Sequence, residues 1–543
     1  MRFISIIISL FLLSCSSKFT TEKPNGEINL KTNSWYFNDL EKDSIPGISL
    51  NKAHQFLNSL KISKGANVVV AIIDTEIDIK HEDLKNKIWI NPHEIPNNQI
   101  DDDKNGYIDD INGWNFLGNM NGENVIFSNF ETTRIVKKYG PKLSSLKEDK
   151  STGPDHKNME LYRRAKIEYD YQLENSILDY EYILDLDKKY KTAKKALSSY
   201  FPEGLYTKEI FYSTIIDTND NNLGLHYLAI KEMLDYDITQ AQIDNQIKSY
   251  KNYLDYYLNV DYNERKTVGD NPDDLLDTKY GNPNISGNIQ DLYHGTLVAG
   301  VLAAERNNGL GIDGIYKNIK LMPLAISSNG DEHDKDIALA IRYAVDNGAK
   351  IINMSSSKEF SMHEEWVKEA LEYAYNNDVL FIRSVSNSNI NIDLEDNYCY
   401  PEKDYNYNYP KVFISVAGST NNLENLKASF SSYGKNSVDI FAPAVDINTT
   451  AVNNKYINDD GNSLAAPIVS RIAALIKSYY PDYAASKIKE ILLKSGTTYQ
   501  VDVKINQEDG TNKIVPFSEL SKSGKVVNAY NALLMAEQLS KRN

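Results

Sequence analysis

The feature that most constrains the fold is a set of short, continuous runs of β-branched and other apolar residues. The first is "ANVVVAIID" (66–74), and three later runs share its form: 349–355, 379–386 and 411–419. Continuous runs are typical of strands buried on both faces of a parallel sheet, because a half-exposed strand alternates polar and apolar residues. Helical stretches are expected between them, at about 291–304, 332–347 and 362–377. The sequence therefore predicts an α/β domain whose helices cover both faces of a mostly parallel sheet.

A long segment, 121–290, interrupts this alternation and is rich in Tyr, Asp, Glu and Lys. Two stretches within it keep a three-four spacing of apolar and aromatic residues, which gives one narrow apolar stripe per helix. The stripes are Met159, Tyr162, Tyr169, Leu173, Tyr180, Ile183 and Tyr190, and then Ile243, Ile247, Tyr250, Leu254 and Tyr257. We expect an inserted helical hairpin or small bundle with these stripes in its core, inside a discontinuous domain formed by 51–120 and 291–535. The insertion is a candidate surface for binding a partner or for self-association.

The N-terminal stretch "MRFISIIISLFLLSC" (1–15) has one arginine, a short apolar run and a cysteine at its end. The run is too short to span a bilayer as a helix and has the form of a signal peptide. Its ending resembles a bacterial lipobox, which implies lipidation of Cys15; the alternative is a secretory signal with a chance cysteine. We expect an exported bacterial lipoprotein, anchored by acyl chains at the periplasmic face or cell surface, with 16–50 as a tether and lead-in.

Composition excludes some partners. The 543 residues carry a formal net charge of −16. This charge argues against nucleic acid as a partner, because phosphate binding requires clustered Lys and Arg, and it is compatible with bound cations. Only two cysteines are present, so no disulfide framework is expected, and Cys399 is expected as a buried free thiol.

Four polar residues stand at the ends of expected strands and helices. Asp74 ends the first buried run, His294 opens a helical stretch, Asn387 follows the run 379–386, and Ser463 lies in "GNSLAAPIV" before an alanine-rich helix. Sites in open α/β sheets lie at the carboxyl ends of the strands. Each residue also has an ordinary structural role available: a helix cap for Asp74 and Ser463, a helix start for His294, and a turn for Asn387.

Taken together, the segments around these residues resemble the subtilisin-like serine peptidases. The resemblance is carried in order by "VVVAIIDTEIDIKHEDL" (68–84), "HGTLVAGVLAAERNNGLGIDGI" (294–315), "GAKIINMSSS" (348–357), "SVSNS" (384–388) and "GNSLAAPIVSRIAAL" (461–475). It implies a three-layer fold with a mostly parallel central sheet and a serine endopeptidase acting on proteins or peptides. It does not extend to the helical insertion.

The resemblance also implies roles for individual residues. Ser463 would attack the peptide carbonyl, His294 would take and return the proton, and Asp74 would orient and stabilise the imidazole. Asn387 would donate to the oxyanion together with the backbone N–H of Ser463. The segment 353–357 matches an edge strand to which an extended substrate is added, which makes Ser355, Ser356 and Ser357 candidate substrate-binding residues.

The chain departs from the family pattern at several positions. Glu76 stands where the family usually has Gly, and Ser386 where a Gly is common before the oxyanion Asn; the remaining departures are Leu297, Asn462 and Leu464. None removes an atom of the proposed triad. Glu76 matters most, because it adds a carboxylate near Asp74.

An acidic loop, "DDDKNGYIDD" (101–110), places Asp101, Asp103 and Asn105 at alternate positions before Gly106. This spacing is that of a calcium-binding loop, although Asn112 stands where a Glu is usual. The predicted ligands are Asp101, Asp103, Asn105, Asp109 and Asp110; the alternative is a solvated acidic loop. Similar loops in relatives imply structural Ca²⁺, and a second, weaker site would pair Asp83 with Asn308.

Two functions remain open at this point. The first is a serine endopeptidase with an Asp74, His294 and Ser463 triad. The second is a catalytically inert scaffold of the same fold that presents its helical insertion to a partner. The intact triad pattern favours the enzyme, whereas the size of the insertion keeps the scaffold in consideration.

Overall fold

The computed structural model describes residues 34–60, 65–144, 154–202, 204, 206–217, 221–306, 308–312, 314, 318–506 and 510–542. At its centre is a nine-stranded sheet in the order β10-β13-β7-β6-β5-β4-β1-β3-β2. All neighbours in this sheet are parallel except β10 and β13. The strands are β1 (Val68–Asp74), β2 (Trp114–Asn115), β3 (Ile319–Ala325), β4 (Ile351–Met354), β5 (Leu380–Ser384), β6 (Phe413–Ser419), β7 (Ile440–Pro443), β10 (Thr497–Thr498) and β13 (Lys525–Val526). The prediction of a mostly parallel α/β fold is confirmed.

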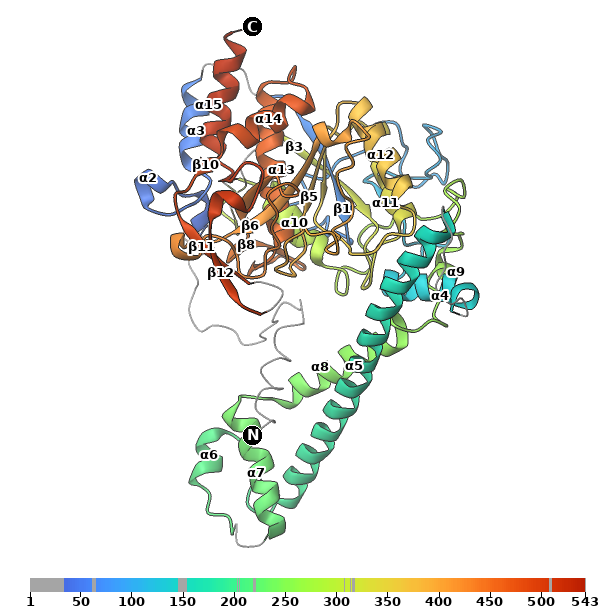
Figure 1. Ribbon diagram of the computed structural model, residues 1–543, viewed down its shortest axis with the longest axis vertical. Helices are drawn as coiled ribbons and strands as arrows, with labels where there is room; N and C mark the ends of the chain where they lie inside the picture. Colours follow the sequence, from blue (N-terminus) through green and yellow to red (C-terminus); the bar gives the residue numbers. More distant parts are fainter. Residues whose placement is uncertain are drawn as a thin grey trace.

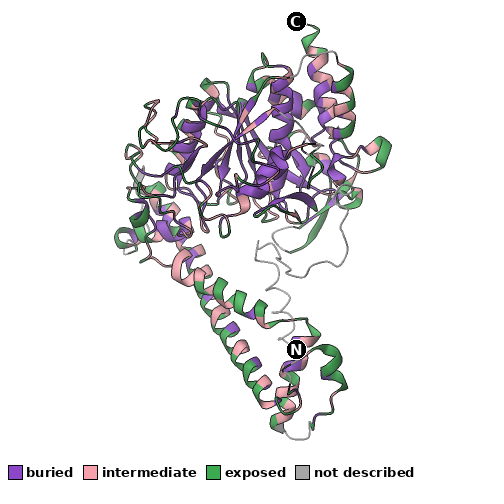
Figure 2. Ribbon diagram, turned by 180° about the vertical axis from the view of Figure 1, so that it is seen from behind, coloured by how far each residue is buried: buried purple, intermediate pink, exposed green. Residues whose placement is uncertain are grey.

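Helices cover both faces of this sheet. Alternate residues of β1 separate two apolar cores: Val70 and Ile72 face one, whereas Ala71 and Ile73 face the other. The first core is covered by α3 (Leu50–Ser59), α10 (His294–Ala303), α13 (Asn462–Tyr479), α14 (Ala485–Ser495) and α15 (Ala529–Ser540). The second is covered by α11 (Asp334–Asp346) and α12 (Glu364–Asn376). Figure 2 shows the buried sheet between these layers.

The described N-terminal residues pack against the domain. Trp35, Tyr36 and Phe37 of a short 3-10 helix are buried in the first core, and the indole N–H of Trp35 donates to the carbonyl of Val445 at 2.9 Å. A short helix, α2 (Leu40–Asp43), leads from there to α3. Cys15 lies outside the described residues. Among the helices that are described, none is both long and apolar enough to cross a membrane.

The insertion projects from the domain as an arm (Figure 1). Its helices are α4 (Glu131–Leu143), α5 (Pro154–Ala196), α6 (Lys208–Ser213), α7 (Asn221–Asp235), α8 (Gln240–Asn252) and α9 (Arg265–Val268), with a π-helical turn at Tyr253–Tyr257. The 43 residues of α5 span about 64 Å at 1.5 Å per residue. Along α5, stripe residues such as Tyr162, Tyr169 and Tyr190 are buried, so these tyrosines pack in the arm's core.

Two small antiparallel sheets complete the domain. One pairs β8 (Ile447–Ala451) with β9 (Lys455–Asp459), and the other pairs β11 (Asp502–Asn506) with β12 (Asn512–Pro516). Strand β9 matters for the site, because the chain passes from its last residue through Gly461 into α13.

Candidate active site

The carboxyl end of β1 and the first residue of α10 meet in a hydrogen bond. His294 Nδ1 lies 2.7 Å from Asp74 Oδ1, and the backbone N–H of Thr75 donates to the same oxygen at 2.7 Å. The helix approaches the strand this closely because Gly295 has no side chain: a Cβ there would lie 2.6 Å from the carbonyl oxygen of Thr75. The other carboxylate oxygen, Asp74 Oδ2, is buried and has no hydrogen-bond partner among the described residues.

Opposing effects act on the His294 imidazole. Desolvation lowers the pKa of His294. The charge of Asp74 and the hydrogen bond to it raise this pKa, with smaller contributions from Asp459 and Glu332, and together they outweigh the desolvation. The net pKa of His294 is raised. The Asp74 carboxylate therefore stabilises the imidazolium form, as a general base that becomes charged during a reaction requires.

Ser463 lies at the beginning of α13, which follows β9 in the chain. Gly461 is the residue that caps this helix, and Ser463 is the second residue inside it. The interpretation of Ser463 as a plain N-cap is therefore wrong; the extended backbone of Gly461 starts the helix instead. A Cβ on Gly461 would lie 3.0 Å from Ser463 Oγ and 3.8 Å from Asn387 Nδ2, so both polar atoms border one small space.

The amide of Asn387 is oriented by its neighbour in the helix start. The backbone N–H of Asn462 donates to Asn387 Oδ1 at 3.0 Å, and the Asn462 side-chain amide donates to the carbonyl of Ser386 at 2.8 Å. Because the oxygen of Asn387 accepts this bond, its NH₂ group is the end that faces the space beside Ser463. An NH₂ group held there can donate to a developing oxyanion.

The segment after β4 reaches the same place. Ser355 Oγ donates to the backbone carbonyl of Ser463 at 2.8 Å and accepts from Asn353 Nδ2 at 2.9 Å. Ser356 Oγ is buried and makes no hydrogen bond within the described chain. Thus Ser355 ties the segment to Ser463, while Ser356 and Ser357 continue away from it.

Glu76 turns away from Asp74 into a cluster of asparagines. Its buried carboxylate accepts from Asn115 Nδ2 at 3.1 Å, from Asn124 Nδ2 at 2.8 Å, and from both the backbone N–H and the side chain of Asn288. Burial raises the pKa of Glu76, while these N–H groups act in the opposite direction. This residue joins the two ends of the insertion to β1 and adds no carboxylate to the Asp74–His294 pair.

The acidic loop gathers a group of oxygens that differs in part from the predicted one. Carboxylate oxygens of Glu94, Asp101 and Asp103 lie within 4.8 Å of one another. Glu94 Oε2 is buried without a hydrogen-bond partner in the described chain. Such oxygens fit a hard cation like Ca²⁺. Glu94 is not among the ligands predicted from the sequence, because it lies in a preceding loop without periodicity.

The other predicted ligands have protein partners of their own. Asn105 Oδ1 accepts the N–H of Tyr107, Asp109 accepts the N–H groups of Asn98 and Gln99, and Asp110 accepts from Asn105 Nδ2 at 3.0 Å. At the second candidate site, Asn308 Nδ2 donates to Asp83 Oδ1, and Asp83 Oδ2 is a buried oxygen with no partner in the described residues.

Known proteins give this geometry its context. The model of the subtilase family matches residues 65–513. Thermophilic serine proteinase of Bacillus sp. (strain AK1) is 36% identical over 186 residues, which cover 34% of this chain and 42% of that protein. Thermostable alkaline protease of Halalkalibacterium halodurans is 31% identical over 205 residues, covering 38% and 52%.

The chain thus spans about half, or less, of the length of these relatives. The solved structure of the prenylagaramide maturation protease PagA aligns with 45% of this chain and 82% of its own at 23% identity, with a TM-score of 0.35. The family match covers most of the chain, including both segments that flank the insertion. The chain belongs to the subtilase family.

Proposed function

We propose that this protein is a serine endopeptidase that hydrolyses peptide bonds in proteins or peptides, with Asp74, His294 and Ser463 as its triad. The proposal has three kinds of support: membership of the subtilase family, similarity to a serine proteinase and an alkaline protease, and the geometry of the site. The observation that carries the proposal is the 2.7 Å contact between Asp74 and His294 at the carboxyl end of β1, together with the contact of Ser463 to Ser355 just after the carboxyl end of β4.

In the proposed reaction, Ser463 Oγ attacks the peptide carbonyl and its proton passes to His294 Nε2. Asp74 holds Nδ1–H and stabilises the imidazolium, while Asn387 Nδ2 and the backbone N–H of Ser463 donate to the oxyanion. Collapse of the tetrahedral species breaks the C–N bond, and the proton on His294 goes to the leaving amine. Water then attacks the acyl-enzyme by the same route, which releases the carboxylic acid and regenerates Ser463.

The test is reaction with a fluorophosphonate probe, followed by mapping of the labelled residue. Labelling at Ser463 in folded protein is expected, together with cleavage of an unfolded polypeptide. The Ser463→Ala variant should lose both, and Ser198→Ala, an exposed serine on the arm, should keep both. Folded protein that is labelled nowhere would contradict the proposal.

The inert scaffold with a binding insertion is not favoured, because the Asp74–His294 pair and the orienting contacts of Asn387 and Ser355 are all present. It would be favoured instead if wild-type protein and Ser463→Ala behaved identically in cleavage and labelling assays.

We also propose that Glu94, Asp101 and Asp103 hold a structural Ca²⁺, with Asp83 and Asn308 as a weaker second site. A bound cation would neutralise the loop's carboxylates and stabilise the fold. Calcium at about 100 times its Kd should add about 2.7 kcal/mol of stability. Thermal unfolding with calcium and with chelator measures this; Glu94→Gln should reduce the difference and the exposed Glu123→Gln should not.

A further inference from the structure

Two chain segments extend past the end of β1 and leave a strand position between them. In the sheet, β1 lies between β3 and β4, but it ends at Asp74. The segment after β3 stays beside Asp74, since the N–H groups of Ile326 and Ser327 donate to the Asp74 carbonyl at 2.9 and 3.2 Å. The segment after β4 stays beside Ser463 through Ser355. The position that β1 vacates therefore begins at the proposed active site.

The backbone edges that face this position are available for pairing. On the outer edges, Asn329 pairs with 126–128 of the insertion and Lys358 pairs with Tyr400. Neighbouring residues along a strand point their N–H and C=O groups to opposite sides. Accordingly, Gly330 and Ser357 face inward, and neither has a backbone hydrogen bond within the described chain. Since β3 and β4 flank β1, their edges start about two strand spacings, about 9.6 Å, apart, which is the width that an extended peptide requires.

A lysine crosses the far end of this position. Lys358, on the β4 side, donates from Nζ to the carbonyl of Glu332, on the β3 side, at 2.8 Å. Its ammonium lies 2.9 Å from Asp334 Oδ1 and 3.4 Å from Glu131 Oε1, and its side chain is only 3% exposed. A strand between the two segments cannot continue past this side chain.

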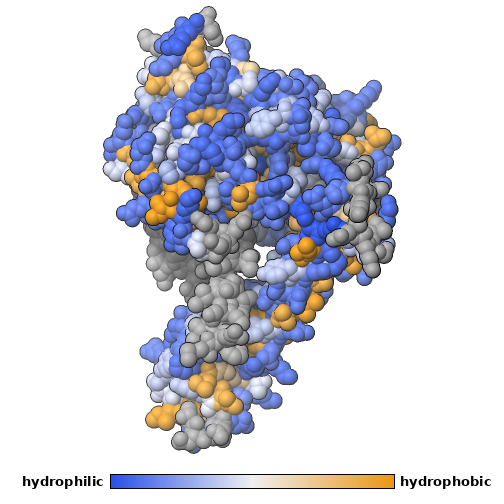
Figure 3. Space-filling model, viewed as in Figure 1, coloured by the Kyte–Doolittle hydropathy of each residue, from blue (hydrophilic) through white to orange (hydrophobic). Residues whose placement is uncertain are grey.

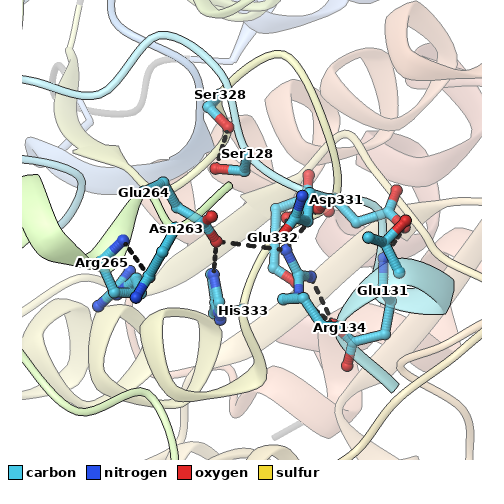
Figure 4. A network of polar contacts seen from close by, with 12 residues as sticks. Ser128, Glu131, Arg134, Asn263, Glu264, Arg265, Ser328, Asp331, Glu332 and His333 are labelled. Carbon is cyan, nitrogen blue, oxygen red and sulfur yellow. Dashed lines mark hydrogen bonds and ion pairs between the residues drawn. The ribbon is translucent and has the colours of Figure 1, made fainter. Parts of the chain in front are cut away.

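The start of α4 closes the same end from the insertion (Figure 4). Arg134 donates to the carbonyls of Asp331 at 2.9 Å and Glu332 at 3.0 Å and pairs with Glu131, while the N–H of Glu131 donates to Asp331 Oδ2 at 2.7 Å. The Glu332 carbonyl therefore already accepts from two cations. The next inward-facing acceptor after Gly330 is not open to a peptide.

We propose that Lys358, Glu131 and Arg134 close the substrate groove after the third residue on the amino side of the cleaved bond. The register follows from Ser355, which lies beside Ser463 and so pairs next to the first residue. Strand residues are about 3.4 Å apart, so Ser357 pairs next to the third residue and Lys358 occupies the place of the fourth. Longer substrates must turn out of the groove at that point. This inference rests on the proposed peptidase function and names its substrate limit.

The test is a set of acetylated peptides with two, three, four and five residues before a fluorescent amine leaving group, sharing the residues nearest the cleaved bond. We expect kcat/KM to rise about tenfold from two to three residues, because the third residue adds one pair of backbone hydrogen bonds to Ser357. From three to four and five residues it should change less than twofold or fall. A further tenfold rise at the fourth residue would overturn the inference.

A matched pair of variants tests the part of Lys358 in the closure. Lys358→Ala removes the crossing side chain, and Lys335→Ala removes another buried lysine that joins the insertion to the domain, 2.6 Å from Asp270. Because Arg134 still donates to the Glu332 carbonyl in Lys358→Ala, the fourth residue should give a partial gain there, about threefold, and none in Lys335→Ala. Equal behaviour of two folded variants would overturn the part assigned to Lys358. If Lys358→Ala does not fold, the wild-type peptide series decides.

Fluorophosphonate labelling distinguishes a failure of the groove closure from a failure of the peptidase function. Wild-type protein that is labelled at Ser463 and yet gains from the fourth residue contradicts the groove closure alone. Wild-type protein that is not labelled contradicts the peptidase function itself.

Discussion

Two polar clusters differ in whether each polar group has a hydrogen-bond or ion-pair partner. At the proposed active site, Asp74 Oδ2 has no hydrogen-bond partner within the described chain, and the side chain of His294 is 36% exposed. At the root of the insertion, Arg265 makes a two-pronged pair with Asp270 and also donates to Asp336, with 3% of its side chain exposed.

The difference separates reactivity from support. A fully paired cluster fixes the position of a structural element, because each desolvated charge depends on an ion-pair partner in another part of the chain. An under-satisfied cluster costs stability, and that cost is tolerated where the groups must meet a substrate. The surface of the arm also has groups without partners, and these are apolar. Figure 3 shows apolar patches along the arm, where Ile167 and Leu225 are 73% and 67% exposed.

The largest expected effect is on kcat/KM and comes from removing His294, the proposed general base. His294→Ala should lower kcat/KM by about 10⁴-fold or more, because no other group can accept the proton of Ser463. Its free energy of unfolding should fall by about 2 kcal/mol or less, since only one charge-assisted hydrogen bond is lost. Peptide hydrolysis and denaturant unfolding measure the two. A loss of stability larger than that of Arg265→Met would contradict the assignment of His294 to catalysis.

The second effect is on the free energy of unfolding and comes from removing Arg265, the cation at the centre of the polar cluster at the root of the insertion. Arg265→Met leaves the buried carboxylate of Asp336 without its cation and leaves Asp270 with Lys335 alone, and the free energy of unfolding should fall by about 3–5 kcal/mol. Since Arg265 does not reach the groove, the labelling rate of the protein that remains folded should stay within about twofold of wild type, or about 0.4 kcal/mol. A large loss of labelling without a loss of stability would contradict this division.

A smaller effect tests the amide beside Ser463. Asn387→Ala should lower kcat by about 10²- to 10³-fold, equivalent to about 2.7–4 kcal/mol, with little change in KM, because the donor acts on the oxyanion and not on the bound substrate. Initial-rate kinetics separate the two constants. An unchanged kcat would exclude Asn387 as an oxyanion donor.

The smallest effect concerns pH. His294 acts as a base only when neutral, so kcat/KM should rise with pH up to its pKa and then level off; since this pKa is raised, the midpoint should lie above the ordinary value of about 6.5. Asp459 contributes to raising the pKa of His294, and Asp459→Asn should therefore shift the acidic limb to lower pH. Asp460→Asn serves as the neighbouring comparison. A shift to higher pH would show that Asp459 does not act through its charge.

The sequence predicted the central strands and helices well because each one carries its own pattern. The run 66–74 became β1, and the helices expected at about 332–347 and 362–377 became α11 and α12. Strand β2 has only two residues, and strands β8, β9, β11 and β12 mix polar with apolar residues, so none of these contains a long continuous apolar run.

The parts of the site that sequence could not supply are those made by distant contacts. Asp74 and His294 were found through a family resemblance, and their contact joins residues 220 positions apart. Glu94 and two partners of Glu76, Asn124 and Asn288, lie in polar loops, where nothing local distinguishes a ligand from a solvated side chain. The closure by Lys358 and Arg134 was missed for the same reason: each is an ordinary basic residue until the fold brings it to the Glu332 carbonyl.

The length of α5 makes the arm a lever. Its near end is fixed to the groove wall, where Arg164 lies over the rings of Phe360 and Tyr398. From Arg164 to Ala196 the helix spans about 48 Å, so a turn of about 10° at Arg164 carries the tip through about 8 Å. A force applied at the tip of the arm also acts over this whole length, so a small force there produces a large torque on the residues beside the groove.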